Sequence, residues 1–386
     1  MKSASSKKPY FLHLVVILIF FLNFQGHAQE QEDDFKPQED DFKPNGKIWG
    51  YVFGDVIFKV GGDTLDFGRS EFAETEKNTI GGVLRRIYFG YDYNLSTKWT
   101  TRLLFESNAS TTTPGGNFGL VVKLGYLEYK GVFEAIPNSK IRVGLIPTPV
   151  FAFPEKAWGY RSVEKEALDL RGFGSSTDQG ISFEGNFSKD GNSGFTIMIG
   201  NGVGNKPQTR KYLEYYISLY KMFFDKKLNL ELMIDYSKRD KDLNRTILRG
   251  FASYSVPNFR AGMEISPNLV NEKASFGQET INIETQPLLL STFISPQVYK
   301  NTWLFLRYDY FNPDRDYNEN ITYGNQSQNY DEHLFIAGVQ IEIHNKLDHK
   351  INIMPNIHIN AYDKKKNGVV DRDPDVVLRT TVYYNF

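Results

Sequence analysis

From residue 47 onward, the chain alternates apolar and polar residues in segments separated by turn residues. Between 228 and 235, for example, leucines and an isoleucine alternate with Asn229, Glu231 and Asp235. Strand side chains point to opposite faces in turn, so each segment predicts a strand with one apolar face. Sixteen segments follow this pattern, at 47–56, 82–94, 99–109, 120–130, 139–146, 180–189, 194–203, 211–224, 228–237, 245–255, 259–265, 287–295, 302–311, 332–343, 350–362 and 375–386.

The connections between the segments alternate in length. Those after even-numbered segments are short, as at 95–98 and 225–227, and most others are longer, up to 147–179. Outer-membrane β-barrels have short periplasmic turns, long external loops and both termini in the periplasm, whereas sandwiches and propellers do not sort their loops this way. We therefore predict an all-β fold: a transmembrane antiparallel β-barrel of about 16 strands in the cell outer membrane.

The final segment, 375–386, ends on an aromatic residue, Phe386. It is apolar on one face and more polar on the other, which is typical of the closing strand of such a barrel. We expect this strand to be the one that the barrel-assembly machinery recognises.

The amino terminus has the three parts of a secretory signal peptide. Lys2, Lys7 and Lys8 precede an apolar run at 11–24, and Gly26-His27-Ala28 is a small-x-small cleavage site. The alternative, a permanent membrane anchor, is disfavoured because the run is short and interrupted by polar residues. We predict a signal peptide at 1–28.

Residues 29–46 contain a near-exact duplication, DDFKPQE followed by DDFKPNG. The segment is acidic, contains two prolines and has no periodic apolar face, so we expect a disordered periplasmic leader. A docking peptide for a periplasmic partner is the alternative. The barrel domain would then occupy 47–386.

Composition excludes several classes of protein. The chain has no cysteine, which excludes disulfide scaffolds and thiolate metal sites. Its formal charge of −1 becomes −4 when the three lysines of the signal peptide leave, too small a charge to imply a nucleic-acid partner. Aromatic residues make up 15%, as suits a barrel whose tyrosines and tryptophans lie at two membrane interfaces.

Charged residues within the strands predict the inner face of the barrel. A lysine or arginine facing lipid at mid-depth costs about 2–4 kcal/mol, so strand charges should face the lumen. On this argument the pore-lining residues are Arg86, Arg102, Glu106, Arg142, Glu184, Glu231, Asp235, Arg307 and Asp309.

The third external loop, within 146–178, is the longest connection and has too many large apolar residues for disorder. Residues 158–170 have helical spacing, with Pro154 before them and Gly172 after them. We predict that this loop folds into the lumen with a short helix and narrows the pore; packing across the outer mouth is the alternative. Its candidate constriction residues are Tyr160, Arg161, Glu164, Glu166, Asp169 and Arg171.

Several motifs resemble the phosphate-selective porin O/P family, especially its Bacteroidetes members. They are Pro147-Thr148-Pro149, Trp158-Gly159-Tyr160-Arg161, Ser176-Thr177-Asp178-Gln179-Gly180 and Arg307-Tyr308-Asp309-Tyr310-Phe311-Asn312-Pro313. The resemblance covers about 47–386 and implies an outer-membrane porin that forms a homotrimer. In that family a ladder of lumenal arginines and lysines leads to the constriction. In this chain the predicted lumenal cations, such as Lys140, Arg249 and Arg260, are accompanied by carboxylates such as Asp92 and Glu264. Such mixed charge produces an electric field across the pore rather than one that draws anions along it.

Three functions fit these features. The first is a passive porin for small hydrophilic solutes or ions; the second is a solute-specific channel for phosphate or another anion; the third is a plugged structural or adhesion barrel. We expect no enzyme activity, cofactor or metal, because the four histidines after residue 28 form no ligand pattern. His358, near Asn356 and Asn360 on the same predicted strand face, is the one position that would suit a catalytic residue.

Overall fold

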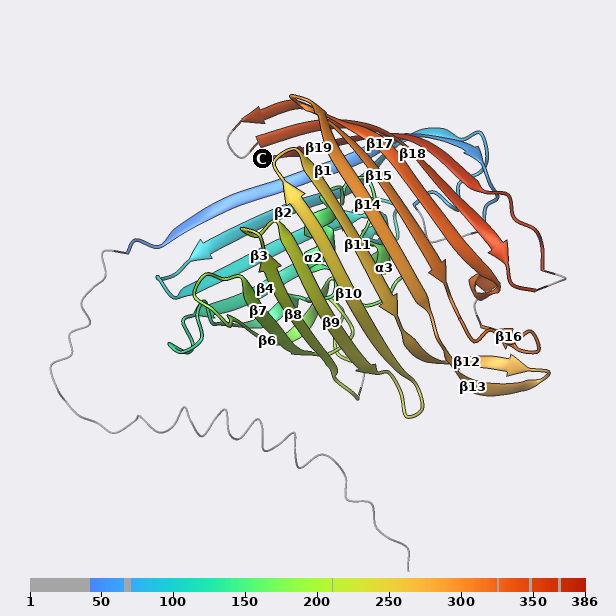
Figure 1. Ribbon diagram of the computed structural model, residues 1–386, viewed down its shortest axis with the longest axis horizontal. Helices are drawn as coiled ribbons and strands as arrows, with labels where there is room; N and C mark the ends of the chain where they lie inside the picture. The colour runs from blue at the N-terminus through green and yellow to red at the C-terminus, as the bar shows by residue number, and fades with distance from the viewer. Residues whose placement is uncertain (1–41, 66–70, 210, 325, 347–348, 367–368) are drawn as a thin grey trace, which may run out of the picture. The chain divides into compact units, whose positions relative to one another are not determined.

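The strands form one antiparallel sheet that closes on itself (Figure 1). The computed structural model describes residues 42–65, 71–209, 211–324, 326–346, 349–366 and 369–386. The predicted signal peptide and residues 29–41 of the predicted leader lie outside these ranges.

The sheet has nineteen strands, of which three short ones belong to connections and sixteen form the wall. The three are β12 (Leu269–Phe276), β13 (Glu279–Thr285) and β16 (Thr322–Tyr323). The wall strands are β1 (Asn45–Gly61), β2 (Ile80–Asn94), β3 (Trp99–Asn108), β4 (Val121–Lys130), β5 (Lys140–Pro147), β6 (Thr177–Asn186), β7 (Ser193–Gly200), β8 (Glu214–Phe223), β9 (Leu228–Lys238), β10 (Asn244–Val256), β11 (Phe259–Pro267), β14 (Leu288–Tyr299), β15 (Thr302–Asn312), β17 (Tyr330–Lys346), β18 (His349–Lys364) and β19 (Asp375–Asn385).

The seam between the first and last strands closes the wall. β1 pairs with β2 on one side and with β19 on the other, and backbone hydrogen bonds of 3.0 and 2.9 Å between Gly50 and Phe386 extend the seam. A closed sheet leaves no unpaired edge, which is the only way a β-sheet satisfies its backbone within lipid. The prediction of a sixteen-stranded antiparallel barrel is confirmed.

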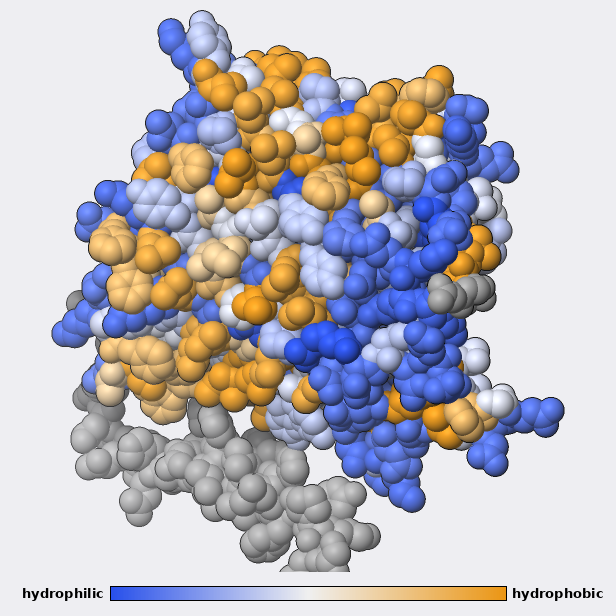
Figure 2. Space-filling view, turned by 45° about the vertical axis from the view of Figure 1, so that its right-hand side comes forward, coloured by the Kyte–Doolittle hydropathy of each residue, from blue (hydrophilic) through white to orange (hydrophobic). Residues whose placement is uncertain are grey.

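The outer face of the wall is apolar. Ile48, Leu232 and Met263 are 60%, 67% and 61% exposed, although residues of this size are normally buried in a soluble protein. Figure 2 shows apolar side chains over much of the visible wall, with hydrophilic residues predominating at the right of the view. The neighbours of these residues along each strand point inward, so the inner face carries most of the strand charges.

The helical parts of the described chain are short. They are α2 (Ala152–Trp158), α3 (Ala167–Leu170) and the 3₁₀ turns η1 (Ala109–Thr111) and η2 (Gln326–Asn329). Among the described residues, no helix has the length and apolar character needed to cross a membrane.

The predicted helix at 158–170 is wrong, because it is replaced by α2 and α3 with a turn between them. Gly159 ends α2 with a φ of 71°, a left-handed conformation that glycine adopts without steric cost. Glu166 then caps α3, since its side chain accepts hydrogen bonds from the backbone N–H groups of Leu168 and Asp169.

Candidate functional site

The connection between β5 and β6, residues 148–176, is called loop 3 below. It packs against the inner face of the wall through two apolar clusters. In the first, Val150, Phe151 and Leu168 lie among inward residues of β7 to β10, β14 and β15, such as Met198 and Ile247. The second unites Trp158, Tyr160, Val163 and Leu170 with Phe251, Phe293, Phe305, Leu334, Ile336 and Met354. Loop 3 therefore covers the wall from β7 to β18.

Four wall arginines fasten loop 3 by donating hydrogen bonds to its backbone carbonyls. Arg249 donates to Val150, and Arg85, Arg379 and Arg307 donate to Ser162, Val163 and Lys165, respectively. Each guanidinium also contacts a wall carboxylate, as Arg249 does with Glu231 at 2.7 Å. Three of these bonds hold the turn between α2 and α3, and the bond from Arg249 holds the segment that precedes α2.

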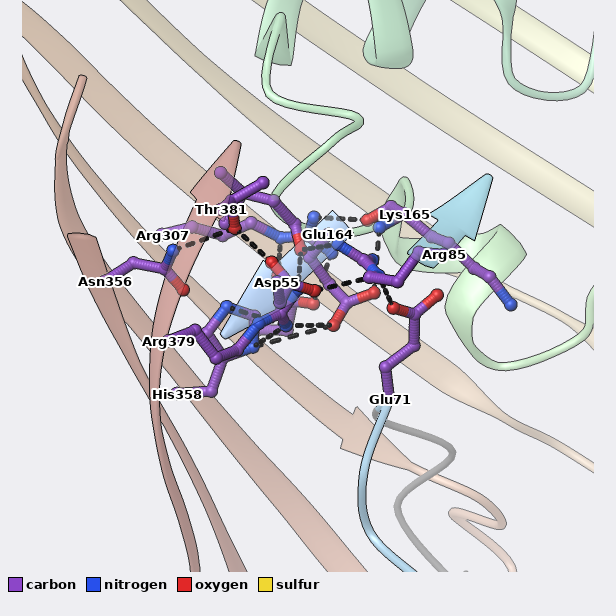
Figure 3. Close-up of polar contacts among 12 residues, drawn as sticks. Asp55, Glu71, Arg85, Glu164, Lys165, Arg307, Asn356, His358, Arg379 and Thr381 are labelled. Carbon is purple, nitrogen blue, oxygen red and sulfur yellow. Dashed lines mark hydrogen bonds and ion pairs between the residues drawn. The ribbon is translucent and has the colours of Figure 1, made fainter. Parts of the chain in front are cut away.

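Two of these arginines, Arg379 and Arg85, belong to a buried cluster that joins four strands to two loops (Figure 3). Arg379 of β19 lies 3.1 Å from Asp55 of β1 and 3.6 Å from Glu164 of loop 3. Arg85 of β2 bridges Asp55 and Glu71, and Glu71 belongs to the connection between β1 and β2. The described residues 71–79 of this connection, called loop 1 below, are therefore tied to the same place as loop 3.

The Glu71 carboxyl remains ionised down to low pH. Its burial would raise the pKa, but the charges of Arg85 and Arg379 outweigh burial and lower it to about 2. Phe72 lies beside it with its ring 5.2 Å from the Arg379 guanidinium. Loop 1 is thus docked by a charge pair and a cation–π contact.

His358 of β18 completes this cluster. Its Nδ1 is 3.5 Å from Glu164, and both ring nitrogens are 3.3 Å from an Arg379 nitrogen. It is 4% exposed, so its contacts are those of a buried side chain that packs loop 3 on the wall. Among the described residues, no cluster of acidic or histidine side chains is arranged to hold a metal ion.

The predicted site residues fall into three groups. Residues of the first group are at most 4% exposed. Each lies in loop 3, under it or beside it on the wall, and contacts another member of the group or a wall residue. They are Tyr160, Glu164, Glu166, Arg171, Glu231, Asp235, Arg307 and Asp309. Within this group Arg171 of loop 3 pairs with Asp309 at 2.7 Å, and Asp235 pairs with Arg245 at 3.1 Å.

The second group follows the wall from β2 to β6 and forms a series of ion pairs. Arg102 pairs with Asp92 at 2.6 Å, and its side chain is 37% exposed. Arg142 pairs with Glu128 at 2.7 Å and with Glu184, and all three retain some exposure. Arg86 pairs with Glu106, which is itself buried. Cations and anions therefore alternate along this part of the wall.

The face of loop 3 that is not packed on the wall carries the other two predicted residues. Arg161 lies 3.1 Å from Glu155 and 3.7 Å from Asp169, and these side chains are partly exposed. Burial raises the pKa of the Glu155 carboxyl, although Arg161 acts in the opposite direction. The charge of Lys123 also acts on the pKa of Glu155, and Tyr88 acts on the pKa of Arg161, so these wall residues of β4 and β2 lie within electrostatic range of this face.

Two cations of this region, Arg85 and Lys123, were not predicted from the sequence because they lie at β-bulges. The register of β1 against β2 shifts beside Arg85, and that of β3 against β4 shifts beside Lys123. A bulge places one extra residue in a strand and re-aims its side chain. Arg85 thus reaches Asp55 at 3.2 Å, and Lys123 reaches Glu106 at 3.0 Å. Strict alternation would have put Arg85 on the outer face, and nothing local in the sequence marks either bulge.

Loop 3 leaves several cavities inside the barrel. One, of about 830 Å³, lies on the side of the short turns and is called the short-turn chamber below. It is lined by Tyr51, Tyr383, Tyr160, Trp303, Arg161 and Arg260, among others. A cavity of 260 Å³ adjoins Arg102 and Arg142, and one of 150 Å³ lies among Arg171, Arg239 and Gln328.

Comparison with known proteins gives structural matches only. No protein-family model and no curated protein sequence matches the chain. The outer-membrane channel DcaP of Acinetobacter baumannii is similar with a TM-score of 0.61 and 11% identity, over 89% of this chain and 97% of that one. An anion-selective porin from Comamonas acidovorans gives 0.56 and 12%, over 89% and 100%. OmpT of Vibrio cholerae, in a trimer form, gives 0.57 and 12%, over 89% and 99%. The chain therefore has the fold of outer-membrane porins.

Proposed function

We propose that this protein is a passive diffusion channel for small hydrophilic solutes or ions. The observation that carries the proposal is the position of loop 3 in a closed, porin-like barrel. It packs on the wall from β7 to β18 and leaves partly exposed charges on the wall from β2 to β6. Water and solutes would pass along that charged wall, at one side of the barrel.

The narrowest part of this path would lie between loop 3 and the wall. Glu155, Arg161 and Asp169 carry the charges of loop 3 on that side, and Tyr88 and Lys123 of the wall lie within electrostatic range of Arg161 and Glu155, respectively. Because each cation in this region is paired with a carboxylate, the field across the path is strong locally and nearly balanced overall. Small ions of either sign would pass with weak preference.

The resemblance to phosphate-selective porins suggests a solute-specific anion channel as the alternative. An anion ladder needs cations free to bind the passing ion. Here Arg86, Arg102 and Arg142 are already engaged by carboxylates, which favours the less selective channel. We also propose that the protein belongs to the phosphate-selective porin family and has no enzyme activity.

We place the protein in the cell outer membrane with both termini in the periplasm. The apolar outer face supports contact with membrane lipid, and the trimer form of the similar OmpT supports a homotrimer. β19, which ends beside Phe386, would be recognised by the barrel-assembly machinery. The signal peptide at 1–28 and the acidic leader remain predictions of the sequence.

Planar-bilayer conductance of the purified, refolded protein tests the function. We expect ohmic current steps with little preference between potassium and chloride, and no block by millimolar phosphate. Block by phosphate would establish the solute-specific channel instead. A folded protein that gives no current would overturn both channels in favour of a plugged barrel.

A further inference from the structure

Arg260, at the start of β11, differs from the other arginines of the inner face. Eleven other arginines of the wall, of loop 3 and of the connection before β19 each contact at least one carboxylate. They are Arg85, Arg86, Arg102, Arg142, Arg161, Arg171, Arg245, Arg249, Arg307, Arg372 and Arg379. Arg260 has no carboxylate within ion-pair distance in the described part of the chain, and its Nε atom is buried without a hydrogen-bond partner. A partly buried guanidinium is costly without an anion, so this exception indicates a missing partner.

The surroundings of Arg260 hold its guanidinium in one orientation. It lies 4.9 Å from the Tyr160 ring centre and 5.3 Å from that of Trp303. The Tyr160 ring is fixed in turn, because its hydroxyl is 2.7 Å from Ser295 Oγ and its ring packs on Phe305 at 4.4 Å. Guanidinium groups stack on aromatic rings in this way and keep their N–H donors for other partners.

Gly159 allows this position. A Cβ atom added at Gly159 would lie 2.1 Å from an Arg260 nitrogen, so any larger residue would push the guanidinium away. The same glycine ends α2 in a left-handed conformation. The turn of loop 3 thus creates the space in which Arg260 lies.

Arg260 lines the short-turn chamber, whose other walls are suited to a ring-bearing solute. Tyr51 and Tyr383 form an aromatic surface there, with ring centres 6.0 Å apart, and Tyr51 stacks on Tyr88 at 4.5 Å. The lining contains four cations, at Arg161, Lys227, Arg260 and Lys350, against three carboxylates, at Glu155, Asp225 and Glu342. A volume of 830 Å³ is that of a pocket for a small organic molecule.

We propose that the short-turn chamber is a binding site for a small aromatic carboxylate. The solute's carboxylate would accept hydrogen bonds from the planar edge of Arg260, the geometry in which arginine binds carboxylates best. Its ring would lie against the aromatic residues of the chamber, a contact that a bare inorganic anion does not use. The site rests on the proposed channel function, which brings solutes to the chamber.

Calorimetric titration of the refolded protein in detergent micelles with benzoate tests this site, with protein-free micelles as the blank. Acetate, benzyl alcohol and inorganic phosphate supply the carboxylate alone, the ring alone and a different anion. We expect saturable binding of benzoate at least tenfold tighter than that of the other three. We also expect Arg260→Gln to weaken benzoate binding at least tenfold, and Arg102→Gln, which changes a cation of the neighbouring cavity, to retain it.

Equal binding of benzoate and acetate, or undiminished binding to Arg260→Gln, would overturn the site. If Arg260→Gln does not fold, Arg260→Lys serves instead, because lysine keeps the charge but lacks the planar pair of donors. Benzoate binding that is not weakened in Arg260→Lys would equally overturn the site. Conductance of the same preparations separates the two proposals. Current without benzoate binding overturns the site alone, whereas benzoate binding without current overturns the channel alone.

Discussion

At the scale of single residues, the inner face holds two kinds of charge pair. Arg249 and Glu231 are both fully buried, and Arg249 also holds the Val150 carbonyl of loop 3. Arg102 and Asp92 are about one-third exposed. A buried pair is costly to break because it leaves one charge without water or partner, while an exposed pair contributes little.

The first prediction compares these pairs. Arg249→Met leaves Glu231 buried and unpaired, so we expect it to lower the free energy of unfolding by about 3–5 kcal/mol. Arg102→Met, the matched control, should lower it by no more than about 1 kcal/mol. Urea unfolding of both variants in micelles measures the difference. Equal losses would show that Arg249 does not anchor loop 3.

Ion preference is also decided by single residues. Arg102→Glu places a second carboxylate beside Asp92 in the proposed path, so we expect the reversal potential to shift toward cation preference without loss of the barrel. Lys189→Glu makes the same charge change in an exposed short turn and should shift the potential much less. An unchanged reversal potential in Arg102→Glu would remove Arg102 from the path.

The sequence predicts which charged side chains lie on the inner face, but not how far each is exposed to solvent. Glu231 and Asp309 are both inward, as alternation and the cost of a charge in lipid require, yet both are buried. Whether a lumenal charge meets water depends on where loop 3 packs. That depends on contacts between residues far apart in the chain, such as Arg249 and Val150, which no local pattern records.

At the scale of elements, strands were predictable and the loops were not. Each of the sixteen wall strands has one lipid-facing apolar side, which leaves a period of two in the sequence. The hairpin of β12 and β13 lies in the connection after β11 and falls outside the sixteen predicted segments. The helix of loop 3 was misplaced because Gly159 ends α2 within an otherwise helical spacing.

Loop 1 gives a prediction about pH. The folded pKa of Glu71, about 2, is below its ordinary value of 4.5, so the folded state favours the ionised carboxyl. Its contribution to docking is complete above pH 4.5 and is lost as the pH falls toward 2. Because the chain has no cysteine, a spin label at Thr75→Cys reports on loop 1 alone.

We expect the label to become more mobile between pH 4.5 and 2. Adding Glu71→Gln should make it mobile already at pH 7, because the amide cannot form the ion pair with Arg85. A label that is equally restrained at pH 7 and pH 2 would show that Glu71 does not hold loop 1.

At the scale of the whole molecule, closure of the barrel follows from the alternating strands, and the course of the channel follows from loop 3. The barrel is wide enough for water, but loop 3 occupies much of the interior. The proposed path runs along β2 to β6, where partly exposed charges line the wall. On this model of the channel, the wall from β2 to β6 meets water, whereas the wall under loop 3 does not.

Cysteine accessibility during bilayer recording distinguishes the two walls, because the chain has no cysteine of its own. Arg102→Cys lies on the proposed path, and Ile247→Cys lies on the wall under loop 3 and is fully buried. A charged, water-soluble thiol reagent should reduce the current through Arg102→Cys and leave the current through Ile247→Cys unchanged. If the reagent instead reduced the current through Ile247→Cys and left that through Arg102→Cys unchanged, the water-filled path would lie under loop 3 and not along β2 to β6.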